Sequence, residues 1–215
     1  MAVRRQEVLA WLAALQQVYS ENRELLTELD SAIGDADHGV NMDRGFTAVR
    51  DELLAHAPED LGDLLKAVAM ILIRKVGGAS GPLYGTLFLR GASACTGKAE
   101  LGAADIVALF QAGIEGIRQR GKADPGDKTM VDALLPALTA MQGTLGEGGG
   151  VEEVLAAGVA AAEDGVKGTI PLQARKGRAS YLGARSIGHE DPGARSSYLL
   201  LQSAANTWTQ KPPAA

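Results

Sequence analysis

The sequence predicts an all-α protein, built as a bundle of eight amphipathic helices. Apolar residues make up 46% of the 215 residues, and aromatic residues make up only 4%. Alanine and leucine dominate the apolar set, which favours closely packed helices over a sheet-based fold. Apolar residues also recur at helical spacing along most of the chain, and no pair of segments has the pattern of neighbouring strands.

The first four expected helices cover the N-terminal half. The first runs from residue 6 to residue 29, with a weak point at residues 20–22, and the second covers residues 40–54. The third begins at Pro58-Glu59-Asp60, because acidic residues favour a helix N-terminus, and reaches about residue 76. The fourth begins at Pro82, a proline in the first turn after Ser80 or Gly81, and reaches about residue 95.

The other four helices complete one domain. The fifth covers residues 103–120. The sixth begins at Thr129, where Thr129-Met-Val-Asp132 resembles a capping box, and ends before the glycine-containing linker at residues 143–150. The seventh covers residues 151–167, and the eighth runs from Asp191-Pro192, a cap followed by a first-turn proline, to shortly before residue 212. We therefore expect a single domain over residues 1–210 and a short flexible tail at 211–215.

Charge and composition exclude several classes of protein. The net charge of −5 and the pI near 5.3 argue against nucleic acid or an anionic membrane as the main partner. A single cysteine, Cys95, excludes an intramolecular disulfide framework. No segment approaches the roughly 18 apolar residues of a membrane span, and the N-terminus becomes polar too early for a signal peptide. We expect a soluble, cytoplasmic protein.

Three carboxylates follow the first expected helix closely. Asp30, Asp35 and Asp37 fall within eight positions, in a stretch that Gly34 and Gly39 prevent from continuing as a regular helix. In a turn, Asp35 and Asp37 project to the same side and Asp30 can fold back toward them. Like charges held together require a cation, and oxygen ligands favour a hard one such as Mg²⁺. The alternative is a solvated loop that ends one helix and caps the next.

Three other segments have the chemistry of phosphate binding. Residues 77–82 form a small-residue loop before a helix N-terminus, where free amides attract anions. Residues 121–129 form a second Gly/Pro loop before a helix. The connection at 168–190 is unusually long for a compact domain and carries Arg175, Lys176, Arg178, Arg185 and His189. Flexible turns and a solvated basic surface are the alternatives. The Walker, Rossmann, EF-hand and zinc-finger patterns are absent.

As a set, these segments resemble the nucleotide-binding L subunits of bacterial dihydroxyacetone kinases. The matching stretches are Asp30 with Gly34–Gly39, Gly77–Pro82, Arg120–Thr129, Gln173–Gly183 and Ser186–Gly193. The resemblance extends over residues 5–208. It implies a closed barrel of eight antiparallel helices, with a nucleotide and metal site formed by the loops at one end.

The resemblance also implies a set of site residues. It places two Mg²⁺ ions on Asp30, Asp35 and Asp37, and it makes ADP or ATP a tightly bound coenzyme. The implied nucleotide contacts are His38, Gly39, Val40, Asn41, Ala79, Ser80, Gly121, Met130, Arg178, Asp191, Pro192 and Gly193. Met130 suits an adenine face, and Arg178 is the implied catalytic residue, which stabilises the transferring phosphoryl group.

Members of this family that depend on the phosphotransferase system work as a relay. An M subunit passes phosphate from the phosphoenolpyruvate system to the bound ADP, and the resulting ATP phosphorylates dihydroxyacetone held on a K subunit. The present chain matches the L module alone, which favours this relay. The resemblance leaves open a ketose or fatty-acid kinase that uses free ATP, a nucleotide-loaded partner of a transcription regulator, and a homodimer.

Overall fold

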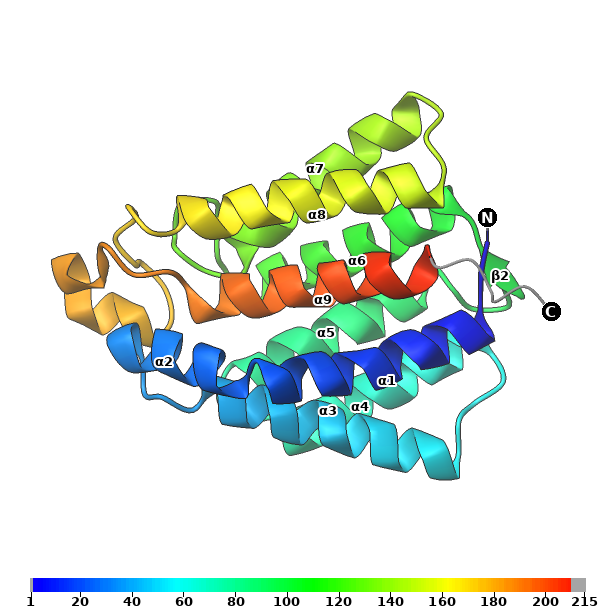
Figure 1. The fold of residues 1–215 in the computed structure, drawn as a ribbon, viewed down its shortest axis with the longest axis horizontal. Helices are drawn as coiled ribbons and strands as arrows, with labels where there is room; N and C mark the ends of the chain where they lie inside the picture. The colour runs from blue at the N-terminus through cyan, green and yellow to red at the C-terminus, as the bar shows by residue number, and fades with distance from the viewer. Residues whose placement is uncertain (1, 210–215) are drawn as a thin grey trace.

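The computed structural model describes residues 2–209 and confirms an all-α protein (Figure 1). The α-helices of the described residues are α1 (Arg5–Glu21), α2 (Arg23–Ile33), α3 (His38–Ala55), α4 (Leu61–Lys75), α5 (Ser80–Ala92), α6 (Ala103–Gly121), α7 (Val131–Gly146), α8 (Val151–Gly168) and α9 (Pro192–Trp208). A 3₁₀ helix, η1 (Arg178–Ser186), lies between α8 and α9. Within the described range, no helix combines the length and apolar character that a membrane crossing requires. The tail predicted at residues 211–215 lies outside the described residues.

The predicted weak point in the first helix is a break between two helices. Asn22 separates α1 from α2, and its side-chain amide donates a hydrogen bond of 2.8 Å to the carbonyl oxygen of Val18. The backbone N–H of Asn22 bonds the same oxygen at 3.0 Å. Asparagine competes for backbone groups in this way and so ends helices. The eight predicted helices therefore become nine α-helices within residues 2–209.

The expectation that no strands pair is wrong in one place. Strand β1 (Val3–Arg4) pairs antiparallel with β2 (Glu100–Leu101), and Val3 lies opposite Leu101. Both apolar side chains of this pair are fully buried. Two residues are too few to produce a detectable alternation, so the sequence pattern cannot reveal this pairing.

The helices pack around one apolar core. Helix α1 contacts α3 and α9, and each helix from α3 to α9 contacts the next along the chain. Within this core, the ring of Trp11 lies 4.8 Å from that of Trp208 and 5.7 Å from that of Phe88, measured between centroids. The indole N–H of Trp208 donates to the carbonyl oxygen of Glu7 at 3.2 Å. The end of α9 is thereby fixed to the beginning of α1.

The connections between helices fall at two ends of the bundle (Figure 1). We call one the cavity end; it carries residues 34–37, 76–79, 122–130 and 169–191. We call the other the terminal end; it carries β1, β2 and the connections at 56–60, 93–102 and 147–150. All segments that the sequence singles out for metal or phosphate chemistry lie at the cavity end.

Candidate functional site

A cavity of about 760 Å³ opens at the cavity end, within the range typical of small-molecule sites. Its lining includes the first residues of four helices, namely His38, Ser80, Val131 and Pro192. In α5 no side chain caps the free N–H groups of the first turn. Because the N-terminus of a helix carries exposed donors and a partial positive charge, this arrangement attracts an anion.

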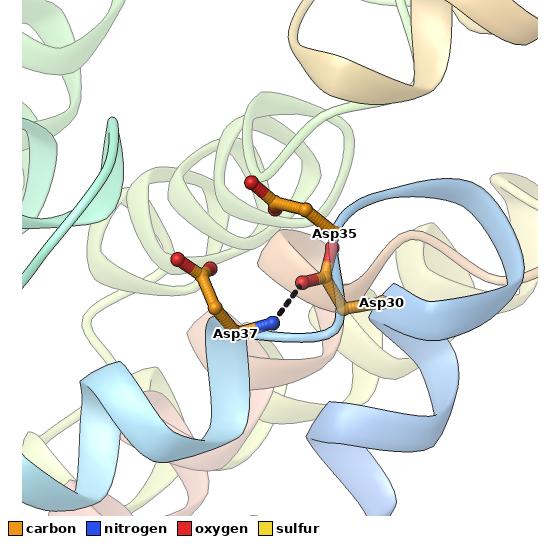
Figure 2. Close-up of side chains that lie close together, drawn as sticks. All are labelled: Asp30, Asp35 and Asp37. Carbon is orange, nitrogen blue, oxygen red and sulfur yellow. Dashed lines mark hydrogen bonds between the residues drawn. The ribbon is translucent and has the colours of Figure 1, made fainter.

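The three predicted metal ligands lie together on one side of the cavity. Each of Asp30, Asp35 and Asp37 offers an oxygen, and these three oxygens lie within 4.8 Å of one another. Figure 2 shows the three side chains gathered around one space, with Asp35 and Asp37 extending to the same side of the connection. The buried Asp30 also organises the turn, because its Oδ2 accepts the N–H of Asp37 at 2.8 Å and that of His38 at 3.1 Å.

The turn that brings these carboxylates together depends on a glycine. A Cβ atom added to Gly34 would lie 2.0 Å from Oδ1 of Asp30, closer than any real contact allows. Two residues later, Ala36 has a φ of 60°, in the left-handed region, and reverses the chain between Asp35 and Asp37. The sequence therefore predicts the turn and the part of Gly34 in it, whereas Gly39, the other glycine expected to interrupt the helix, lies within α3.

The acidic cluster has little compensating positive charge from the protein. Among the described residues, the ion pair from Arg178 Nη2 to Asp35 Oδ2, at 2.9 Å, is the only one that any of the three carboxylates makes. Both partners are exposed, by 70% and 38% of their side-chain surface, so the pair contributes little by itself. Three gathered carboxylate oxygens with so little compensation fit a hard divalent cation such as Mg²⁺.

His38 joins three of the helices that begin at the cavity. It is buried, its Nδ1 lies 3.1 Å from Ser80 Oγ, and its Nε2 lies 2.8 Å from Ser196 Oγ. The hydroxyl of Tyr84 lies 2.7 Å from the same Ser196 oxygen. Burial lowers the pKa of His38, although the carboxylate of Asp30 opposes the shift. A neutral imidazole therefore connects α3, α5 and α9.

Asp191 caps α9 from inside the cavity. Its Oδ2 accepts the N–H of Ala194 at 2.7 Å, and its own N–H donates to Thr169 Oγ1 at 3.0 Å. Burial raises the pKa of the Asp191 carboxyl to about 7, more than the hydrogen bond from Ala194 lowers it. The cap is thus an aspartate that titrates near neutral pH.

The positively charged part of the lining comes mainly from the long connection. Arg175, Lys176 and Arg178 line the cavity from this segment, and Arg120 lines it from the end of α6. Apolar residues Ile33, Leu83 and Ile117 form other parts of the lining. The cavity therefore combines carboxylates, cations, helix N-termini and apolar surface, which suits a ligand with phosphate groups and a flat apolar part.

Most of the residues implied by the family resemblance meet in this cavity. The predicted residues that line it are Asp30, Asp35, Asp37, His38, Ala79, Ser80, Gly121, Met130, Arg178, Asp191, Pro192 and Gly193. Their roles toward a metal or nucleotide stay predictions.

Gly39, Val40 and Asn41 lie outside the lining. Gly39 is packed against α2, since an added Cβ would lie 2.0 Å from the carbonyl oxygen of Arg23. Val40 is partly exposed, and the Asn41 side chain is buried and accepts a hydrogen bond from Arg44.

One lining residue, Lys128, has a role that the sequence does not reveal. It is buried, and its ammonium group donates to backbone carbonyl oxygens of the long connection. Lys122 occupies the same Gly/Pro segment but is exposed. Both lysines follow small or polar residues in a loop, so no sequence pattern separates them.

Comparison with known proteins identifies the family. The model of the DAK2 domain matches residues 32–206, and the chain belongs to this family of proteins. The family predicted from the loop motifs is therefore confirmed.

The chain is similar over nearly its whole length to individual subunits. It is 45% identical to the ADP-binding subunit DhaL of the PEP-dependent dihydroxyacetone kinase of Escherichia coli (strain K12), covering 94% of this chain and 96% of that one. It is 42% identical to the ADP-binding subunit DhaL of the PTS-dependent dihydroxyacetone kinase of Lactococcus lactis, covering 89% and 92%. The crystal structure of the dihydroxyacetone kinase from C. freundii in complex with AMP-PNP and Mg²⁺ superposes with a TM-score of 0.72 at 24% identity, over 96% of this chain and 34% of that one, and shows the shared fold.

Proposed function

We propose that this protein is the ADP-binding subunit of a phosphoenolpyruvate-dependent dihydroxyacetone kinase. Its bound ADP receives phosphate from an M subunit, and the ATP formed phosphorylates dihydroxyacetone on a K subunit. The observation that carries the proposal is the similarity to the Escherichia coli ADP-binding subunit, which covers 96% of that subunit. The cavity supports this proposal, since its charges and size suit a nucleoside diphosphate with a divalent metal ion.

In the proposed site, the phosphates lie where the acidic cluster faces the helix N-termini. Asp30, Asp35 and Asp37 hold two Mg²⁺ ions, which neutralise and orient the phosphate oxygens. Ser80 and the free amides at the start of α5 bind phosphate oxygen. Met130 and its apolar neighbours in the lining contact the base.

Arg178 is the proposed catalytic residue of this subunit. It lies on η1 at the rim of the cavity, and its guanidinium already reaches the acidic cluster at Asp35. A cation at this place stabilises the charge on the phosphoryl group during transfer. The chain requires no nucleophile of its own, because the attacking hydroxyl belongs to dihydroxyacetone.

The helix contacts support the predicted architecture. Contacts run from α1 to α3, onward through each helix to α9, and from α9 back to α1. This circuit supports a closed barrel whose site lies among the loops at one end. It also supports the single domain predicted over residues 1–210.

Reconstitution tests the proposed function. The protein alone, supplied with dihydroxyacetone and ATP, should form no dihydroxyacetone phosphate. Adding a K subunit, an M subunit and a phosphoenolpyruvate relay should give sustained turnover, with ADP remaining on the protein. Fast multiple turnover with ATP and the K subunit alone would instead identify an ATP-dependent kinase.

A further inference from the structure

Lys128 combines complete burial with a charged head group. Its side chain is 1% exposed, and its Nζ donates to the carbonyl oxygens of Thr169 at 2.9 Å, Leu172 at 3.1 Å and His189 at 2.5 Å. A fourth carbonyl oxygen, that of Ile170, lies 3.5 Å away. Within the described residues, no carboxylate pairs with this ammonium group. Backbone carbonyls therefore supply its hydrogen-bond acceptors.

The cost of burying this charge points to a specific role. Removing an ammonium group from water is unfavourable unless hydrogen bonds replace its hydration. Here three short bonds use the three N–H donors of Nζ. One of these acceptors, Thr169, follows directly after α8, where the helix dipole concentrates negative partial charge. The site is therefore built for a cation.

The acceptors lie at the two ends of one segment. Thr169, Ile170 and Leu172 begin the connection between α8 and α9, and His189 nearly ends it. The same base is closed by the bond from Gly188 N–H to Ile170 O at 2.8 Å and by that from Asp191 N–H to Thr169 Oγ1 at 3.0 Å. Lys128 thus joins the start and the end of the connection and fixes both to the beginning of α7.

The segment closed in this way carries Arg178. Between its ends, the connection is held by the bond from Arg175 N–H to Asp127 O at 3.0 Å and by a small apolar cluster around Ile33 and Ala174. Much of η1 beyond this cluster is exposed, and the Arg178 side chain is 70% exposed. The position of Arg178 over the acidic cluster therefore depends on how firmly the base of the connection is closed.

We infer that Lys128 is a positioning residue for phosphoryl transfer, which closes the base of residues 169–191 and so holds Arg178 over Asp35. The closure itself follows from the contacts of Lys128, while its consequence for transfer rests on the proposed function.

Amide hydrogen exchange tests whether Lys128 closes the base of residues 169–191, and it requires no phosphoryl transfer. Lys128→Met keeps the length of the side chain and removes the charge, and Lys122→Met is a matched control. Lys122 lies with Lys128 in the connection between α6 and α7 and has a similar left-handed backbone (φ 48° against 62°), but its side chain is exposed. Amides at 172–188 should exchange at least about tenfold faster in Lys128→Met, and at the wild-type rate in Lys122→Met.

Unchanged exchange at residues 172–188 in Lys128→Met would overturn the inference. If that variant loses its helical circular dichroism, Thr169→Val takes its place, because it removes another bond of the same base with little change in volume. It should accelerate exchange in the same amides to a smaller extent, and wild-type exchange in a folded Thr169→Val would likewise count against the closure.

A double-mutant cycle tests the consequence for transfer. Single-turnover transfer from bound ATP in the reconstituted kinase is measured for Lys128→Met, Arg178→Ala and both together. If Lys128 acts through Arg178, the double variant should be about as slow as Arg178→Ala alone. Multiplied effects would overturn the inferred link. A wild-type rate in Arg178→Ala would refute the proposed role of Arg178, and the exchange result would still decide whether Lys128 closes the connection.

Discussion

The ion pairs at the terminal end and the acidic cluster at the cavity end use charged residues in opposite ways. At the terminal end, charged groups are paired with partners of opposite sign: Arg4 lies 3.1 Å from Glu100, and Lys98 lies 2.7 Å from Asp105. At the cavity end, three carboxylates gather, and a single exposed arginine is the only cation paired with them in the described residues. Charged groups that have only a structural role usually find hydrogen-bond or ion-pair partners within the folded protein. Like charges held together against their repulsion indicate a ligand.

The start of one helix, α5, differs in a similar way from helix starts at the terminal end. At the terminal end, acidic side chains accept the first free N–H groups: Asp105 accepts from Gly102 at 2.9 Å, and Glu153 accepts from Gly150 at 3.0 Å. At the cavity end, Asp30 and Asp191 accept N–H groups at the starts of α3 and α9 in the same way, but α5 begins without such an acceptor. Since free donors at a helix N-terminus are normally satisfied, those of α5 remain available for an anionic ligand.

The largest effect is expected from the acidic cluster. Asp35→Asn and Asp37→Asn should each weaken Mg²⁺-dependent binding of ADP by more than about a hundredfold, since changes merely next to a metal ligand already cost up to that factor. The ADP released by denaturing the purified protein measures retention. Asp63→Asn is the control, an exposed aspartate of the terminal end that pairs with Lys66. Full ADP content in both site variants would show that the cluster does not bind the metal.

A smaller effect is expected at the rim of the cavity. Arg178→Ala should slow phosphoryl transfer by about a hundred- to a thousandfold, as the loss of a single charge-stabilising donor does. Affinity for ADP should fall much less, because the guanidinium acts mainly in the transition state. Quenched-flow kinetics measures the rate of phosphoryl transfer, and equilibrium titration measures the affinity for ADP. Arg185→Ala, on the same 3₁₀ helix, should behave like the wild type. Equal losses of rate and affinity in Arg178→Ala would indicate ground-state binding instead.

How far the sequence predicts the molecule depends on whether the determining contacts are local. The helices follow from apolar spacing, and the break at Asn22 and the turn at Gly34 follow from residues next to them. The burial of Lys128 does not, because its acceptors come from a segment more than forty residues further along the chain. The pairing of β1 with β2 is also missed, because each strand has only two residues and nearly a hundred residues separate them.

Two glycines at opposite ends should respond oppositely to alanine. Gly34→Ala would place Cβ against Oδ1 of Asp30 and displace that carboxylate, at a cost of about 1–3 kcal/mol. Gly143 in α7 has open space around it, so Gly143→Ala should stabilise the helix by about 0.5–1 kcal/mol. Thermal unfolding with and without Mg²⁺ and ADP measures both. Gly34→Ala should also lose the stabilisation that these ligands give the wild type; its retention would contradict the tight turn.

The smallest expected effect compares two aspartates that cap helices at opposite ends. Asp60 caps α4 at the terminal end, is partly exposed, and accepts the N–H groups of Asp63 at 3.0 Å and Gly97 at 2.7 Å. The hydrogen bond from Gly97, followed by that from Asp63, holds the pKa of Asp60 below its usual value. Asp191 caps α9 at the cavity end, where burial raises its pKa to about 7. The pKa of the capping aspartate is therefore shifted in opposite directions at the two ends.

The two caps should give opposite pH dependence to the free energy of unfolding in protein stripped of nucleotide and metal. Between the unfolded pKa of about 4 and its folded value of about 7, native Asp191 keeps a proton that the unfolded chain has lost. Its contribution therefore falls as pH rises through this window, by up to about 1.4 kcal/mol per pH unit, and levels off above it. The contribution of Asp60 is present above its unfolded pKa and is lost as pH falls through its lower folded pKa.

Urea unfolding from pH 3 to pH 9 of Asp191→Asn and Asp60→Asn, each compared with the wild type, isolates the two contributions. Relative to the wild type, the free energy of unfolding of Asp191→Asn should increase as pH rises toward 7. The amount by which Asp60→Asn is less stable than the wild type should decrease below about pH 4. Differences that stay flat with pH would mean that burial at the cavity end does not set the state of Asp191.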